Sequence, residues 1–280
     1  MKLFRLLFNS ILFIMAAAGC KDNFISNYQT TPGGDHPIVP ESRQLKILLI
    51  GSSYLGYNDF PSMFANFCTG GSKLAVVETA IEYGKLLDYH SENPATIEKI
   101  HSQKWDYVVL QDAPSTIGYP DNHNLIFPSY TKHDIYKAIA KLDSIIRSNN
   151  NLAKTILVMP WAYEDGLTWI QGQTDTYEIM QKNVFDNSVA WAKELNIGLS
   201  PVGWAFNEVL KTNKQLHYLF QSDFNHPSYK GAYLMACVLY TTIYNESCRN
   251  NSYFRYLNKS EAEYFQNIAS ELRVTFNYGL

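Results

Sequence analysis

Five short apolar runs alternate with longer amphipathic stretches from Leu45 onward, and this alternation limits the folds open to the chain. The first run, LKILLIG (45–51), is continuously apolar, as expected for a strand buried on both faces. Alternating strands and helices form right-handed βαβ units. The sequence therefore predicts a three-layer α/β/α sandwich with a mainly parallel five-stranded sheet. The other strands are predicted at 73–81, 105–111, 153–161 and the start of 197–212.

Helix signals fill the intervals between the strands. Pro61 lies near the first turn of one predicted helix, Asn93 is a predicted N-cap, and Pro227 opens another helix. In parallel sheets of this kind, ligands bind at the carboxyl ends of the strands. The helices are predicted at 59–71, 93–103, 132–148, 175–196, the later part of 197–212, 226–245 and 260–276.

Length and composition are those of a globular protein. Of the 280 residues, 46% are apolar and 18% are charged, so residues 45–280 can form one domain with a buried core. The net charge of −3 gives no reason to expect nucleic acid as a partner. A small molecule or a glycan is the expected partner.

The first 20 residues have the pattern of a signal peptide, with a basic start, an apolar stretch and the small-residue ending AAGC. This ending resembles a bacterial lipobox, in which Cys20 is lipidated and attaches the mature chain to a membrane. Ala17 departs from the commoner leucine, so cleavage followed by plain secretion stays open. Residues 21–44 are polar and contain proline and glycine, which predicts a flexible tether. The expected location is periplasmic or on the cell surface.

Three cysteines remain if Cys20 carries lipid: Cys68, Cys237 and Cys248. An odd count without CxxC or histidine-rich spacing argues against a disulfide framework and a metal site. Cys68 and Cys237 lie in apolar helical segments and are expected to be buried. A disulfide from Cys248 to one of them stays open.

A serine follows the first predicted strand in the stretch LLIGSSYLGYNDFP (48–61). Ser53 lies just before the first predicted helix, where backbone N–H groups favour developing negative charge. It is the predicted nucleophile. The alternative is that Ser52 and Ser53 only form a turn or a helix cap.

A histidine with a nearby acid lies late in the chain, in QSDFNHPSYKG (221–231). Asp223 precedes His226 by three residues, so its carboxylate can reach Nδ1 and leave Nε2 for the serine. The alternative is that Asp223 forms a turn and His226 is a surface residue. Among the other histidines, only His90 is retained as a second candidate.

Taken together, these motifs resemble the SGNH/GDSL hydrolase superfamily, especially a bacterial subgroup that is often secreted. In that family a Gly-x-Ser after the first strand supplies the nucleophile, which corresponds here to Ser53 in GSS (51–53). A glycine after the second strand donates an oxyanion N–H, and Gly84 is the best match. A late Asp-x-x-His supplies acid and base, which correspond to Asp223 and His226. Further similarity runs through 105–115, 159–166, 180–195 and 200–210.

Two positions depart from the family pattern. The family's oxyanion asparagine is absent after the third strand, where Gln111 stands, and the amide NH₂ of Gln111 is an alternative donor. Tyr83 replaces a second glycine before Gly84, and its bulk is expected to narrow the pocket or shift the Gly84 amide.

The resemblance implies a flavodoxin-like fold and a serine esterase that needs no cofactor and no metal. The oxyanion hole would consist of the Ser53 and Gly84 N–H groups and the Gln111 side chain. Export favours a carbohydrate substrate that loses acetyl groups. A lipase or lysophospholipase stays open, as does a catalytically silent surface lipoprotein that binds glycans. Four aromatic residues in the loops after strands three and four are expected to pack there or to stack on sugars: Tyr119, Trp161, Tyr163 and Trp169.

Overall fold

The computed structural model describes residues 43–120, 134–168, 175–212 and 218–275, all within one compact unit from Glu41 to Leu280. The predicted signal peptide, Cys20 and the tether up to residue 42 lie outside the described residues, so these assignments stay predictions. Within the described ranges, no helix has the length and apolar character needed to cross a bilayer.

A five-stranded sheet with every neighbouring pair parallel forms the centre of the unit, in the order β2-β1-β3-β4-β5. This confirms the predicted fold class. Gly51 pairs with Ile81, and Ile50 pairs with Leu110, so the first three strands end close together. The strand order reverses between β1 and β3, which is where such sheets bind ligands. The strands are β1 (Leu45–Gly51), β2 (Ala75–Ile81), β3 (Tyr107–Leu110), β4 (Lys154–Val158) and β5 (Gly198–Ser200).

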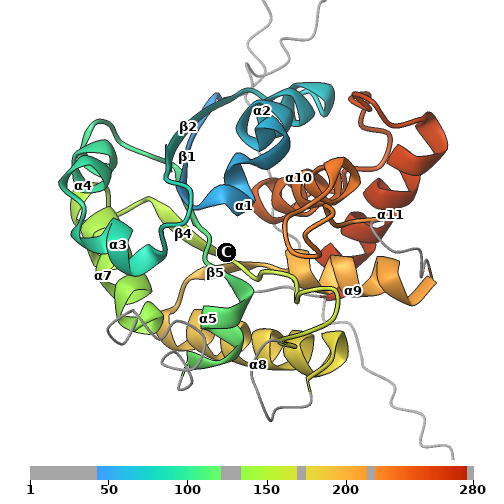
Figure 1. Cartoon of the computed structure of the whole chain (residues 1–280). Coiled ribbons are helices and arrows are strands. Elements are labelled where there is room, and N and C mark those ends of the chain that lie inside the picture. The colour runs from blue at the N-terminus through green and yellow to red at the C-terminus, as the bar shows by residue number, and fades with distance from the viewer. Residues whose placement is uncertain (1–42, 121–133, 169–174, 213–217, 276–280) are drawn as a thin grey trace, which may run out of the picture. The chain divides into compact units, whose positions relative to one another are not determined.

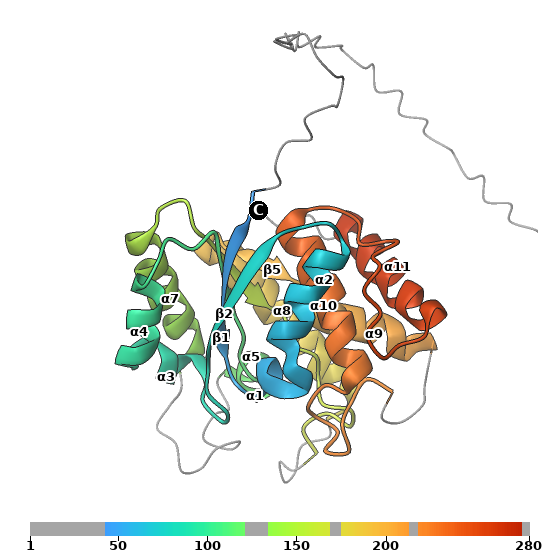
Figure 2. The same ribbon diagram turned by 90° about the horizontal axis from the view of Figure 1, so that it is seen from above.

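Helices cover both faces of the sheet. The long helices are α2 (Phe60–Gly70), α4 (Pro94–His101), α7 (Ile135–Asn149), α8 (Tyr177–Leu195), α9 (Val202–Thr212), α10 (Tyr229–Tyr244) and α11 (Lys259–Thr275). Helices α2 and α10 pack together on one face, and α4 and α7 lie on the other (Figure 1, Figure 2). Helix α11 packs outside α10, while α8 contacts β5.

Local sequence signals explain several of these boundaries. The side chain of Asn93 accepts a hydrogen bond from the Ala95 N–H and caps α4, with Pro94 at its first position. Ser228 caps α10 through the Gly231 N–H. The residues of β1 from Ile47 to Ile50 are fully buried, as the unbroken apolar run predicted.

The short elements at the carboxyl edge of the sheet were missed by the sequence analysis. They are α1 (Ser53–Gly56), the 3₁₀-helix η1 (Tyr57–Asp59), α3 (Leu87–Glu92) and α5 (Pro114–Gly118). Each is too short to show a helical period in the sequence. They lie around the end of β1, where the site predicted from the sequence is located (Figure 1).

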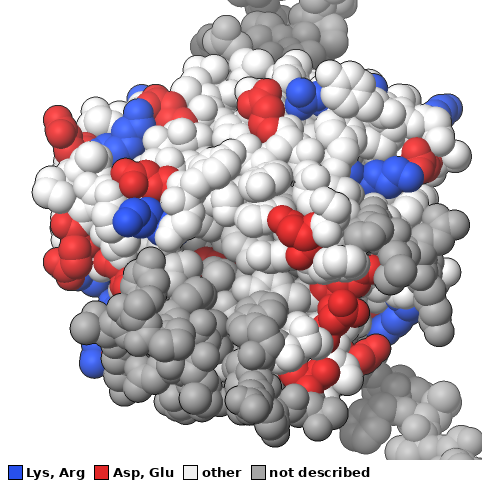
Figure 3. Space-filling view, viewed as in Figure 1, with Lys and Arg blue, Asp and Glu red and all other residues white. Residues whose placement is uncertain are grey.

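Charged side chains are interspersed on the face shown in Figure 3, where Lys and Arg do not gather into a patch. The three cysteines of the described residues, Cys68, Cys237 and Cys248, are buried and free. Burial of Cys68 and Cys237 agrees with their apolar helical context.

Candidate active site

Ser53 is the first residue of α1 and follows β1 after a single residue. Its side chain is half-buried, and its Oγ lies 2.7 Å from Nε2 of His226. Ser52 is buried instead, and its Oγ lies 3.2 Å from Oε1 of Gln111. Of the two serines, Ser53 is therefore the one presented to a histidine.

His226 and Asp223 lie together on the tight loop that precedes α10. Oδ2 of Asp223 is 2.6 Å from Nδ1 of His226, and Oδ1 accepts the backbone N–H of Asn225 and of His226 at 3.1 and 2.9 Å. An acceptor at Nδ1 places the proton on that nitrogen and leaves Nε2 to accept a proton from Ser53. The structure thus brings together the serine, histidine and aspartate that the sequence analysis selected.

Hydrogen bonds keep the Asp223 carboxyl ionised. Partial burial acts to raise its pKa, but the His226 ring and the two backbone N–H groups together lower that pKa below its ordinary value. An ionised Asp223 stabilises the imidazolium that would form when His226 accepts a proton.

Hydrogen bonds fix the loop that contains His226 relative to Ser53. The Tyr54 hydroxyl donates to Oδ1 of Asn225, and Nδ2 of Asn58 donates to the carbonyl of Pro227 at 2.8 Å. Nε1 of Trp161 donates to the carbonyl of Asn225 at 2.9 Å. The residues on both sides of His226 are thereby fixed relative to Ser53. Sequence analysis missed these positioning contacts, which join residues far apart along the chain.

The backbone N–H groups of Ser53 and Gly84 are the predicted donors to an oxyanion. Gly84 lies in the turn after β2 at φ +73°, a left-handed conformation that glycine adopts without strain. A Cβ at Gly84 would meet no atom within 4 Å, so the space beside it is open. Among the described residues, no hydrogen bond engages the N–H of Ser53 or of Gly84. Such donors suit an oxyanion.

Solved structures share this architecture over most of their length. One is a DUF4886 family protein from Bacteroides uniformis, with a TM-score of 0.68 and 17% identity over 83% of this chain and 95% of that one. Another is a candidate SGNH hydrolase from Slackia heliotrinireducens, with a TM-score of 0.57 and 21% identity over 72% of this chain and 100% of that one.

A third similar structure is a catalytic mutant of an acetylxylan esterase from Geobacillus stearothermophilus. Its TM-score is 0.52 and its identity is 18%, over 71% of this chain and 94% of that one. The chain has the SGNH hydrolase fold. No protein-family model matches its sequence, and no curated protein matches it.

Gln111, the predicted replacement for an oxyanion asparagine, directs its amide to neighbouring residues. Oε1 accepts the N–H of Ser52 at 3.1 Å, and Nε2 donates to the carbonyl of Asp112 at 2.7 Å. The side chain is almost fully buried. These contacts hold the backbone just before Ser53. The role of the Gln111 amide as a third hydrogen-bond donor to the oxyanion stays a prediction.

Gly51 is the residue that makes this bracing possible. A Cβ at position 51 would lie 2.8 Å from both the backbone oxygen and Oε1 of Gln111. The strand therefore ends in glycine because Gln111 approaches its backbone closely.

His90, the second candidate histidine, contacts the end of β1 and is not part of the Ser53–His226–Asp223 group. Its Nε2 donates to the carbonyl of Gly51 at 3.0 Å, and its Nδ1 accepts from the Thr96 hydroxyl at 2.9 Å. Burial lowers its pKa, which keeps the ring neutral. His90 supports the end of β1.

Asp112, next in sequence to Gln111, is a fully buried acid. Its carboxylate accepts the N–H groups of Leu87 and Ala113, each at 2.7 Å, and lies 2.5 Å from the Thr116 hydroxyl. Burial raises its pKa to about 6 despite these hydrogen bonds. Its bond to Leu87 fixes the end of the loop that contains Gly84.

The predicted aromatic residues pack against the protein. Trp161 stacks on Phe206 with ring centroids 4.4 Å apart, and the hydroxyl of buried Tyr163 donates to the Ser115 hydroxyl. Tyr119 is half-buried and donates to Asp175 at 2.5 Å. Trp169 lies outside the described residues.

Tyr83 is an exposed aromatic residue whose ring contacts Tyr57 and the backbone of α1. Its ring stacks on Tyr57 with centroids 6.0 Å apart and leaves the space next to Gly84 open. The expectation that Tyr83 narrows the pocket or shifts the Gly84 amide stays a prediction.

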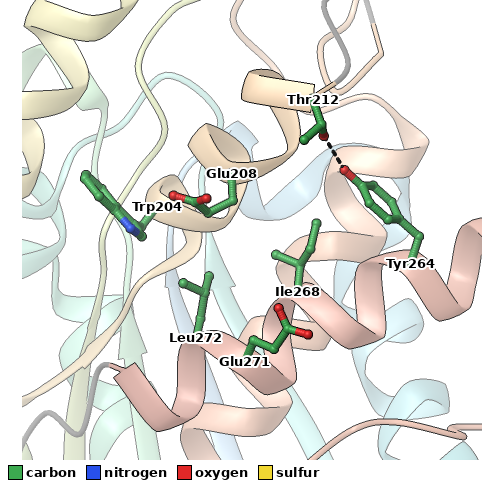
Figure 4. Close-up of a pocket in the computed structure, with 7 residues that line it drawn as sticks. All are labelled: Trp204, Glu208, Thr212, Tyr264, Ile268, Glu271 and Leu272. Carbon is green, nitrogen blue, oxygen red and sulfur yellow. Dashed lines mark hydrogen bonds between the residues drawn. The ribbon is translucent and has the colours of Figure 1, made fainter.

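A separate surface hollow lies between α9 and α11 (Figure 4). None of its lining residues belongs to the serine–histidine–aspartate group. Its two carboxylates, Glu208 and Glu271, form ion pairs with Lys211 and Arg249 at 2.8 and 3.1 Å. The lining residues are Trp204, Glu208, Thr212, Tyr264, Ile268, Glu271 and Leu272.

Proposed function

We propose that the chain is a serine esterase that hydrolyses carboxylic esters through Ser53, His226 and Asp223. The observation that carries this proposal is the continuous hydrogen-bonded series from Ser53 Oγ to Nε2, at 2.7 Å, and from Nδ1 to Asp223, at 2.6 Å. The SGNH fold of the similar structures supports it.

The proposed reaction has two acyl-transfer steps. Ser53 Oγ attacks the ester carbonyl carbon while Nε2 of His226 takes its proton, and the N–H groups of Ser53 and Gly84 stabilise the oxyanion. The imidazolium then protonates the alcohol oxygen, the C–O bond breaks, and an acyl-serine remains. Water repeats the sequence on that intermediate, which releases the acid and regenerates Ser53.

The proposed substrate is an acetylated carbohydrate. The acetylxylan esterase among the similar structures supports this choice, as does the expected export of the chain. Release of acetate from acetylated xylan, pectin and peptidoglycan tests it, with a small aryl acetate as the positive control. If the aryl ester is cleaved and none of the polymers releases acetate, the carbohydrate assignment fails.

An acyl-length series separates this proposal from lipase activity. For the carbohydrate esterase, p-nitrophenyl acetate should be cleaved with a higher kcat/KM than the octanoate and palmitate esters. A preference for the long chains would support a lipase or lysophospholipase. Retained glycan binding without any hydrolysis would support the silent binding protein.

A further inference from the structure

Three rings form a continuous stack that begins at the proposed base. Tyr57 stacks on the His226 imidazole with centroids 4.2 Å apart and an interplanar angle of 19°. Tyr83 in turn stacks on Tyr57, with ring centroids 6.0 Å apart and an interplanar angle of 17°. The Tyr83 side chain is 62% exposed, so the stack runs from the base to the solvent.

The backbone of α1 is shaped to receive the Tyr83 ring. A Cβ at Gly56 would lie 2.3 Å from Cε1 and 2.5 Å from the hydroxyl oxygen of Tyr83. The ring therefore lies directly against the Gly56 backbone, in contact with both α1 and Tyr57. An exposed tyrosine with such contacts loses little further freedom when a ligand packs on it.

The stack lies on the alcohol side of the proposed ester. Because His226 must deliver its proton to the alcohol oxygen, the departing alcohol lies next to the imidazole. Rings packed along the imidazole therefore border the alcohol part of the substrate. Gly84, next in sequence to Tyr83, is exposed, and a Cβ added there would meet no atom within 4 Å.

We propose that Tyr83 determines specificity for the alcohol part of the ester by stacking on the pyranose ring of an acetylated sugar. This inference rests on the proposed esterase function and names the part of the site that selects its substrate. A tyrosine face offers a broad apolar surface to the C–H face of a sugar. Of the aromatic residues first considered for this role, Tyr119, Trp161 and Tyr163 contact other parts of the protein. Tyr83 is accessible.

The test compares two acetate esters that differ in the alcohol. Acetylated methyl xyloside contains a pyranose ring, and glyceryl triacetate does not. In the full chain, Tyr83→Ala is expected to lower kcat/KM for the xyloside about threefold to tenfold, the range of one aromatic contact, and to leave the triacetate rate nearly unchanged. Tyr83→Trp keeps a flat aromatic face and is expected to keep the xyloside rate.

Two further variants locate the effect at the ring. Gly56→Ala displaces the Tyr83 ring and is expected to reproduce the selective loss. Tyr256→Ala removes another exposed tyrosine ring, 79% accessible, which contacts Tyr229 and not His226. That control is expected to leave the ratio of the two rates unchanged.

Binding separates failure of this inference from failure of the esterase proposal. Calorimetric titration of Ser53→Ala with acetylated methyl xyloside, with and without Tyr83→Ala, needs no turnover. Threefold to tenfold weaker binding on loss of the ring is expected, since it corresponds to about one aromatic contact. Equal binding by the two variants, or equal loss of both ester rates in Tyr83→Ala, would overturn the stacking role. If wild type hydrolyses neither ester, the esterase proposal fails, and the binding comparison still tests the stacking role of Tyr83.

Discussion

Replacing Asp112 by asparagine should flatten the dependence of folding stability on pH between about pH 4 and pH 6. The carboxyl is fully buried, and its pKa is raised from 3.8 to about 6. Burial is the main cause, and the charge of Asp88 adds to it. Hydrogen bonds from Thr116, Leu87 and Ala113 oppose the rise without cancelling it.

The size and sign of the effect follow from the two pKa values. Between them the folded chain holds a proton on Asp112 that the unfolded chain has released, so stability falls as the pH rises through this window. A difference of about two units corresponds to about 3 kcal/mol. The loss is absent below the unfolded pKa of Asp112 and complete above its folded pKa. Asparagine cannot ionise and removes this contribution.

Urea unfolding at a series of pH values measures the effect. Thr116→Val is the matched variant, because it removes a hydrogen bond that lowers the pKa of Asp112. It should extend the fall in stability to higher pH, whereas Asp112→Asn should remove it. Parallel pH–stability curves for wild type and both variants would refute the assignment of a raised pKa to Asp112.

Two further variants, with Gly118→Ala as a control, test the geometry of the site. Gly51→Ala places a Cβ 2.8 Å from the backbone oxygen of Gln111 and should cost about 1–3 kcal/mol of stability, together with turnover. A Cβ in Gly118→Ala has its nearest contact with a Val184 side-chain atom at 3.1 Å, and its backbone contacts are at 3.7 Å or more, so this variant should cost less by thermal unfolding; equal costs would contradict the close-approach argument. Asp223→Asn turns an amide NH₂ toward Nδ1, favours the wrong histidine tautomer, and should lower kcat about 10⁴-fold. Retention of a tenth of the p-nitrophenyl acetate rate would exclude that role.

Strong local patterns explain what could be predicted from the sequence. The unbroken apolar run of β1 and the proline and asparagine at the start of α4 determine these elements locally. Asp223 and His226 are three residues apart, so their contact also follows from local geometry. The parallel sheet follows from the order of strands and helices.

The contacts between distant segments could not be predicted in the same way. Tyr54 meets Asn225, and Tyr57 meets His226, only after the sheet has brought α1 next to the loop before α10. The direction of the Tyr83 ring depends on Gly56, at the end of α1. The Gln111 amide is oriented by the backbone of Ser52. Each depends on tertiary packing that no single-sequence pattern records.

Hydrolysis of p-nitrophenyl acetate by the full chain tests the central claim most directly. Wild type should turn over, while Ser53→Ala and His226→Ala should fall to the background rate with unchanged circular dichroism. Ser52→Ala is the matched control and should still turn over, because Ser52 is buried and its Oγ contacts Gln111. An inert wild type, or a Ser53→Ala variant that keeps the wild-type rate, would contradict the assignment of Ser53 as the nucleophile.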